Sequence, residues 1–128
     1  MAGVIHTTDP DETGIDIYLG IGGAPEGVLA AAALRCIGGQ MQGRLQLNTD
    51  EKVARAAKMG ISDPTKVYQM DEMARGDVLF AATGVTDGNL LAGVKFARDY
   101  IQTHTIVMRS SSLTVREIKA KHQDMDKF

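Results

Sequence analysis

The order of apolar and polar positions along the chain predicts a succession of strands and helices. Residues 15–20 alternate and are rich in β-branched side chains, which is typical of a strand. Residues 28–37 are dense in alanine and leucine, which have the highest helix propensities. Pro25 suits the first turn of this helix, and Gly38 suits its C-terminal stop. The segment is therefore expected to form a strand, a glycine turn and a helix.

The middle of the chain repeats this order. We expect a second strand over residues 42–48 and a second helix over residues 51–59. A short strand over residues 66–69 and one or two helical turns from Asp71 onward are expected to follow. Thr49 or Asp50 is a suitable N-cap for the second helix, and Gly60 ends it.

The last third of the chain changes to strand patterns alone. Residues 78–83 form a continuous apolar run, which predicts a strand buried on both faces. Three further strands with turns between them follow, over residues 91–96, 100–109 and 113–119, and the charged tail 122–128 is expected to fray. The order β-α-β-α-β followed by an antiparallel meander predicts an α/β fold, with a mixed sheet flanked by helices in a single domain over residues 1–128.

Composition narrows the class of protein. The net charge is −2 and no run of Lys or Arg occurs, which argues against nucleic-acid binding. No apolar stretch approaches the roughly 18 residues of a membrane span, and the N-terminus does not resemble a signal peptide. The single cysteine, Cys36, lies in an apolar run and is expected to be buried rather than reactive. These features favour a cytoplasmic globular protein.

One segment suggests chemistry, the glycine-rich run of residues 20–27. Its glycines let a ligand approach the backbone closely, and the start of the helix favours an anion. Glu26 adds a carboxylate, which would repel a bound phosphate unless a divalent cation such as Mg²⁺ lay between the two anions. Spacing alone still favours a plain structural turn, by about two to one, because glutamate in a first helical turn stabilises any helix.

The sequence Asp-Ile-Tyr-Leu-Gly-Ile-Gly-Gly-Ala-Pro-Glu-Gly-Val of residues 16–28 resembles the signature of class II fructose-1,6-bisphosphatases of the GlpX type. The likeness continues in residues 31–35, 38–45, 58–61, 66–68, 80–88 and 103–104. It implies the C-terminal subdomain of a sugar-phosphatase fold, related to the inositol monophosphatase type. It also implies removal of the 1-phosphate of fructose 1,6-bisphosphate with Mg²⁺ or Mn²⁺ in gluconeogenesis. By the same resemblance, Glu26 is a metal ligand and Gly23 binds substrate through its backbone.

The resemblance also implies that the other acidic ligands lie upstream of the matched segment. We therefore expect the N-terminal metal-binding half to be absent from this chain. Met1 is then expected to be either an engineered start or the first residue of a truncated gene product. A chain with one such carboxylate is expected to be inactive by itself. The parent enzyme is expected to be a homo-oligomer, and a bifunctional parent that also accepts sedoheptulose 1,7-bisphosphate is an alternative. The alternative function is a non-catalytic module for anion binding or oligomerisation.

The remaining polar residues have structural interpretations that we prefer. Asp9, Asp11 and Glu12 are expected in a solvated loop, and His104 is expected to be a structural histidine in a strand. Residues 110–112 are expected to form a turn. The candidate cations for a phosphate are Arg35, Arg44 and Lys58, for which we prefer a role as solvated surface.

Overall fold

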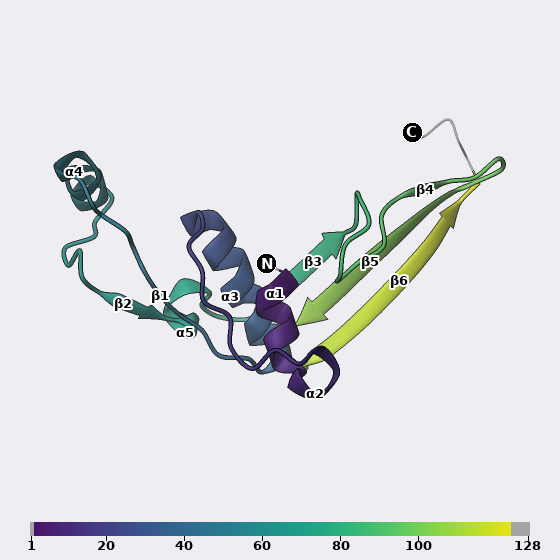
Figure 1. Ribbon diagram of the computed structural model, residues 1–128, viewed down its shortest axis with the longest axis horizontal. Coiled ribbons are helices and arrows are strands. Elements are labelled where there is room, and N and C mark those ends of the chain that lie inside the picture. Colours follow the sequence, from purple (N-terminus) through teal and green to yellow (C-terminus); the bar gives the residue numbers. More distant parts are fainter. Residues whose placement is uncertain (1, 124–128) are drawn as a thin grey trace.

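The computed structural model describes residues 2–123, which fold into helices and two antiparallel sheets (Figure 1). The α/β class with helices flanking the sheets is confirmed. In chain order the elements are α1 (Ala2–Ile5), the 3-10 helix η1 (His6–Thr8), α2 (Pro10–Thr13), α3 (Ala24–Ile37), β1 (Gln42–Arg44), α4 (Asp50–Lys58), β2 (Val67–Gln69), α5 (Met70–Met73), β3 (Leu79–Thr83), β4 (Lys95–Phe96), β5 (Ile101–Arg109) and β6 (Thr114–His122).

The larger sheet is built around β5. Strand β6 pairs with β5 along its whole length, from Ile101 opposite His122 to Arg109 opposite Thr114. On the other edge of β5, β3 pairs with its second half and the short β4 with its first two residues. The antiparallel meander expected for the last three strands is therefore confirmed as β4, β5 and β6.

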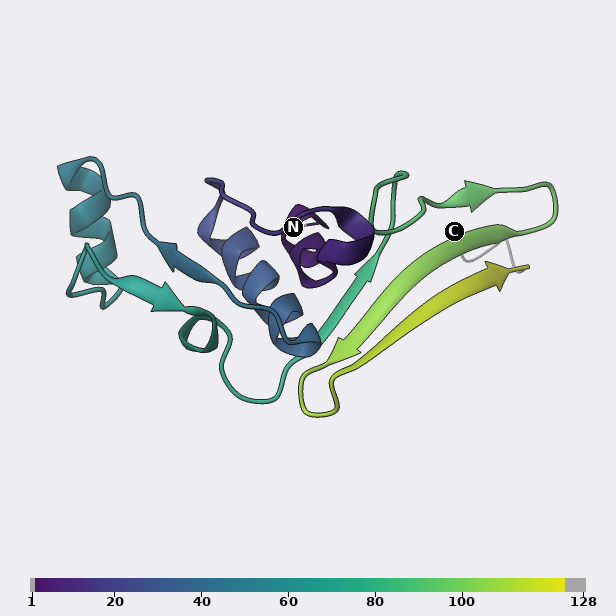
Figure 2. The same cartoon turned by 60° about the horizontal axis from the view of Figure 1, so that its bottom comes forward.

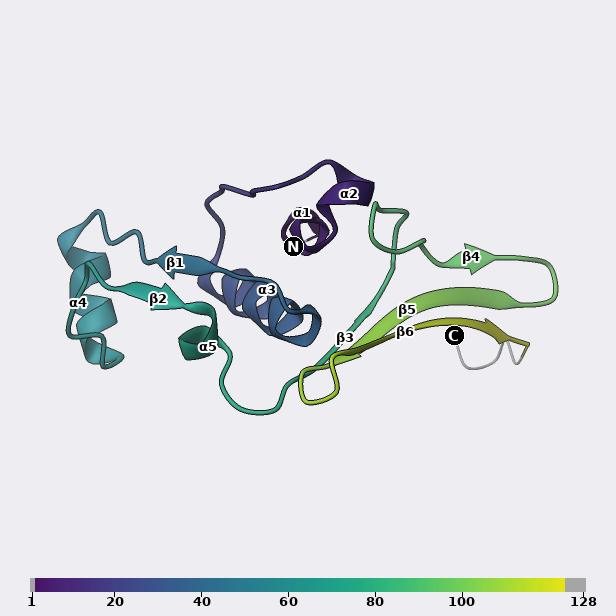
Figure 3. The same cartoon turned by 90° about the horizontal axis from the view of Figure 1, so that it is seen from below.

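The smaller sheet is a ribbon of β1 and β2 that leads to α4 and back. Figures 2 and 3 both show this ribbon and α4 at one end of the elongated molecule, with β5 and β6 at the other end. The described strands thus divide into two antiparallel sheets, where the sequence predicted one mixed sheet. The strand predicted for residues 42–48 is confined to β1, because β2 offers only three residues for pairing.

Helix α3 joins the two ends and covers one face of the larger sheet. Its side chains Ala33 and Cys36 are fully buried and pack in one cluster with Phe80 of β3, two residues of β5, Ile5 and Leu91. The helix ends at Gly38, whose φ of 81° is the left-handed conformation that glycine adopts without strain. Burial raises the pKa of the Cys36 thiol, which confirms the interpretation of this cysteine as a buried residue.

The strand predicted over residues 15–20 is not formed. This segment has no neighbouring strand among residues 2–123, and Ile17, Leu19 and Ile21 are 72%, 84% and 82% exposed. A strand needs a partner for its backbone hydrogen bonds, so the pattern alone does not suffice. The sequence also missed the short helices before it, α1, η1 and α2.

Two further strand predictions need correction. Residues 78–83 were expected to be buried on both faces, but Phe80 is 4% exposed whereas Leu79 is 72% exposed, because helices cover one face only. The strand expected over residues 91–96 is reduced to β4. The residues before β4 form a compact loop instead, in which the Gly93 N–H donates to the Asp87 carboxylate at 2.9 Å.

His122 closes β6, so it does not fray as predicted, and residues 124–128 lie outside the described residues. Within residues 2–123, none of the helices has the length and apolar character that a membrane crossing requires.

Asp77 connects the start of β3 to the turn between β5 and β6. Its carboxylate accepts hydrogen bonds from Arg109 Nη2 at 2.7 Å, from the Ser110 hydroxyl at 3.1 Å and from the Ser111 N–H at 3.3 Å. The same hydroxyl accepts the Val78 N–H at 2.8 Å. These hydrogen bonds to the carboxylate lower the pKa of Asp77 to about 2, and the bond from the Arg109 guanidinium has the largest effect.

Stability is therefore expected to depend on the ionised form of Asp77. Because folding lowers its pKa, the stabilisation is fully present above about pH 4 and is lost as the pH falls toward about 2. Thermal unfolding of the wild type and of Asp77→Asn should therefore give melting temperatures that differ near pH 5 and converge toward pH 2. A difference that stays constant across this range would contradict the assignment.

Candidate functional site

The glycine-rich turn leads directly into α3 and leaves its start open. Gly23 is the N-cap, with extended φ and ψ of −67° and 148°, and no side chain caps the helix. Pro25 occupies the first turn, as predicted, and the Gly27 N–H donates to the Gly23 carbonyl at 3.0 Å. The first N–H groups of an α-helix have no acceptor within the helix, so this end favours an anion.

The structure brings the two predicted site residues, Gly23 and Glu26, into contact. Glu26 is exposed in the first turn of α3, and its side chain folds back over the Gly23 backbone. A Cβ atom added at Gly23 would lie 3.1 Å from Glu26 Cδ and still closer to the carboxylate oxygen Oε2. The absence of a side chain at residue 23 therefore makes room for the carboxylate at the helix start.

One carboxylate fits part of a divalent-cation site. Mg²⁺ binds through one or two carboxylates together with phosphate oxygens and water, which Glu26 beside an anion-binding turn would satisfy in part. Within residues 2–123, no group of three or more His, Cys, Asp or Glu side chains is placed to hold a metal ion. The acidic residues Asp9, Asp11 and Glu12 lie at α2, where all three are exposed, as the solvated interpretation requires.

His104 has the structural role that the sequence predicted. It is 9% exposed on β5, and its Nδ1 accepts the Ala92 N–H at 3.1 Å. Its Nε2 lies 3.5 Å from the Glu117 carboxylate on β6. The ring thus fixes the loop before β4 against the sheet. Residues 110–112 form the predicted turn between β5 and β6.

The cations that the sequence considered do not gather at the turn. Arg35 donates from Nη1 to the Ala74 carbonyl at 2.8 Å, so it connects α3 to the end of α5. Arg44 lines a shallow hollow on the β1–β2 ribbon, and Lys58 is exposed at the end of α4. A second pocket lies beside Gly23, between α4 and the glycine turn, and none of these three side chains lines it.

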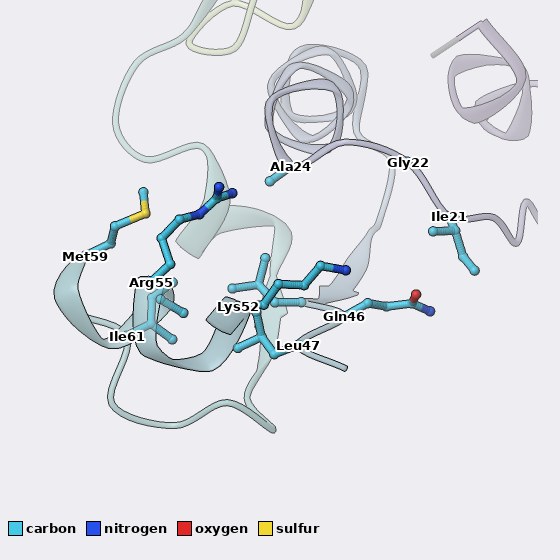
Figure 4. Close-up of a pocket in the computed structure, with 11 residues that line it drawn as sticks. Ile21, Gly22, Ala24, Gln46, Leu47, Lys52, Arg55, Met59 and Ile61 are labelled. Atoms are coloured by element: carbon cyan, nitrogen blue, oxygen red, sulfur yellow. The ribbon is translucent and has the colours of Figure 1, made fainter. Parts of the chain in front are cut away.

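Two cations that the sequence did not single out do line that pocket. It has a volume of about 430 Å³ and lies between α4 and the glycine turn (Figure 4). The turn contributes Gly22 and Ala24, which flank Gly23, and α4 contributes Lys52 and Arg55. The sequence contained one signal for this pair of cations. Lys52 and Arg55 are three residues apart on a predicted helix, and this spacing places both side chains on one face.

A glycine turn that opens a helix, with a carboxylate folded over it and cations nearby, defines an α/β domain with a site suited to a cation and a phosphate. The family model described as "Bacterial fructose-1,6-bisphosphatase, glpX-encoded" matches residues 1–122. The chain belongs to this family, as the resemblance of its signature implied.

Two relatives illustrate the similarity. The "D-fructose 1,6-bisphosphatase class 2/sedoheptulose 1,7-bisphosphatase" of Synechococcus sp. (strain JA-3-3Ab) is 46% identical over 123 residues, which cover 86% of this chain and 35% of the relative. The protein of the same name from Synechococcus sp. (strain RCC307) is 43% identical over 124 residues, which cover 86% of this chain and 37% of the relative. The chain therefore spans little more than a third of the length of these relatives.

Proposed function

We propose that this chain forms the C-terminal part of a metal-dependent fructose-1,6-bisphosphatase, over a single domain of residues 1–128. The reaction is hydrolysis of fructose 1,6-bisphosphate to fructose 6-phosphate and phosphate. Membership of the family supports this assignment. The observation that carries it is the contact between the Glu26 side chain and the Gly23 backbone at the uncapped start of α3.

Each residue of this pair has a distinct role in the proposal. Glu26 provides one carboxylate ligand for Mg²⁺ or Mn²⁺, and the Gly23 backbone binds the substrate. The bound metal supplies charge neutralisation at the phosphate and activation of a water molecule. Further carboxylates come from polypeptide that corresponds to the other two-thirds of the relatives, so the 128-residue chain alone is inactive.

The names of the relatives include a second activity, sedoheptulose 1,7-bisphosphatase. We extend both substrates to the site proposed here, because both are sugars with a phosphate at each end. We also infer action in the cytoplasm, in gluconeogenesis, by a homo-oligomeric enzyme. These statements rest on membership of the family.

Reconstitution tests the proposal. We define the reconstituted enzyme as this chain mixed with a separately produced polypeptide that covers the part of the strain JA-3-3Ab relative outside the match. Phosphate release from fructose 1,6-bisphosphate is expected with Mg²⁺ or Mn²⁺ in the mixture, and not with either polypeptide alone. Activity of the 128-residue chain by itself would contradict the shared site, and an inactive mixture of two folded, associated polypeptides would contradict the function.

The alternative, an association module without catalysis, is favoured by one observation. Ile17, Leu19 and Ile21 are highly exposed in a segment that pairs with none of the described strands. Such surfaces commonly mark protein–protein contacts. Sedimentation at increasing concentration tests this alternative, since a chain that remains monomeric at high concentration does not associate through this segment.

Gly23→Ala is expected to impair the reconstituted enzyme with little effect on folding. The new Cβ would collide with the Glu26 carboxylate and displace it, while the extended backbone at residue 23 accepts alanine. We expect activity to fall roughly 10-fold or more, and the free energy of unfolding to change by less than about 1 kcal/mol. Gly27→Ala is the matched control, because a Cβ at that position meets none of the described residues within 4 Å and Gly27 does not line the pocket beside the turn. Equal loss in both variants would contradict the proposed role of Gly23.

A further inference from the structure

We propose that two copies of this chain associate through the outer edge of β6, as antiparallel strands related by a two-fold axis at Ile118. The pairing joins the larger sheets of the two copies into one continuous sheet. The inference gives a contact for the homo-oligomer of the proposed function, and in that respect it rests on it. It does not depend on the catalytic site at Gly23 and Glu26.

Strand β6 has a long edge for such a contact. It pairs with β5 along its whole length on one side. On its other side, from Val115 to Lys121, it pairs with none of the strands described in residues 2–123. Figures 1 and 2 show β6 along the outside of the larger sheet. The backbone N–H and C=O groups on such an edge can form a ladder with a further strand.

Most of the devices that prevent pairing at a sheet edge are absent from β6. The strand contains no proline, and its register with β5 is uninterrupted, so it has no β-bulge. Charged side chains are a further such device, and β6 carries four of them, Arg116, Glu117, Lys119 and Lys121. Because both signs occur, the order of these charges decides which strand can pair with the edge.

The order of charges in β6 is complementary to itself in one register. In an antiparallel pair, residues directly opposite each other share a face, where opposite charges attract and like charges repel. With the axis at Ile118, Glu117 of each copy lies opposite Lys119 of the other, and the two Ile118 side chains meet. The other facing pairs are Arg116 with Ala120 and Val115 with Lys121. No two like charges therefore lie opposite each other.

The neighbouring registers all bring like charges together. An axis at Glu117 places two carboxylates opposite each other, and an axis at Lys119 places two ammonium groups there. An axis between two residues, on either side of Ile118, places Arg116 opposite Lys119 or Lys121. Repulsion in the alternatives is what makes a contact specific, so the charges of β6 select the register centred on Ile118.

The side chains of this pairing are available for it. Lys119 forms no ion pair with another of the residues 2–123. The Glu117 side chain is 62% exposed, and its carboxylate lies 3.5 Å from His104 Nε2, which is too long for a strong hydrogen bond. Ile118 is 45% exposed, so its contact with the other copy shields apolar surface. Exposed ion pairs contribute little affinity, which comes here from the backbone ladder, while the charges fix the register.

Charge reversal tests this contact with matched variants. Sedimentation equilibrium of the 128-residue chain at low salt is expected to show a reversible dimer. Glu117→Lys and Lys119→Glu should each weaken the dimer roughly 10-fold or more, because two attractive pairs become repulsive. The double variant Glu117→Lys/Lys119→Glu should recover the wild-type affinity, and the two single variants should form a heterodimer when mixed. Lys58→Glu on α4 is the control, since it changes the net charge away from β6 and should leave the dimer intact.

The remaining outcomes distinguish this contact from its alternatives. A wild-type chain that stays monomeric, or a dimer that neither single variant weakens, would overturn the inference; the second result would direct attention to Ile17, Leu19 and Ile21. Amide exchange in β6 that slows only when the other polypeptide is added, and not with rising chain concentration, would also overturn it. Charge-dependent dimers together with an inactive reconstituted enzyme would overturn the proposed function and support the β6 contact.

Discussion

Glu26→Gln is expected to lower kcat/KM of the reconstituted enzyme about 1,000-fold, at a fixed and moderate Mg²⁺ concentration. Glutamine has the size of glutamate but no charge, so it replaces an anionic metal ligand by a much weaker one. Metal assistance is worth several kcal/mol of transition-state stabilisation, and about 4 kcal/mol corresponds to a factor of about 1,000. The measurement is the initial rate of phosphate release from fructose 1,6-bisphosphate.

A matched variant shows whether the effect belongs to the site. Glu51 is also an exposed carboxylate in the first turn of a helix, α4, and it does not line the pocket beside the turn. Glu51→Gln should therefore retain the wild-type rate. A higher concentration of Mg²⁺ or Mn²⁺ should restore part of the activity of Glu26→Gln, because the defect is in metal affinity. A Glu26→Gln rate close to that of the wild type would contradict the metal-ligand role.

Leu34→Ala is expected to lower the free energy of unfolding of the chain by about 3 kcal/mol. Leu34 is 0% exposed on α3, and its side chain lies so close to Gly39 that a Cβ added there would meet it. Truncation removes its apolar contacts and leaves a cavity that close-packed neighbours fill only in part. Urea unfolding, followed by circular dichroism, measures this loss.

Leu29→Ala is the matched control on the same helix. Leu29 is 51% exposed, so its truncation removes less buried surface, and alanine has the higher helix propensity. We expect its free energy of unfolding to differ from the wild type by less than about 1 kcal/mol. Equal losses for Leu29 and Leu34 would contradict the difference in burial between these two positions of α3.

Helices α3 and α4 were predictable because their signals are local. Pro25 and Gly38 mark the two ends of α3 in the sequence, and both occupy these positions in the structure. Thr49 was one of two candidate caps for α4, and its hydroxyl accepts the Lys52 N–H at 3.3 Å. The contact between Gly23 and Glu26 has the same origin, because three residues across an N-cap and first turn bring a side chain back over the backbone.

Features that depend on distant partners were not predictable. Residues 15–20 have the composition of a strand, yet a strand forms only beside another, and no neighbour is present within residues 2–123. The pocket arises because the β1–β2 ribbon carries α4 to a place opposite the glycine turn. The sequence alone therefore did not distinguish Arg55 from Arg35, which instead binds the Ala74 carbonyl.

Paramagnetic broadening by Mn²⁺ tests the central claim, that Glu26 holds the metal beside Gly23, most directly. The reconstituted enzyme would contain this chain with isotope label and the other polypeptide without it, and Mn²⁺ would be added at less than one equivalent. The account predicts that amide signals of residues 23–27 broaden first and that Glu26→Gln abolishes this effect. Broadening centred on Asp9, Asp11 and Glu12 of the α2 region, or broadening of residues 23–27 that persists in Glu26→Gln, would contradict it.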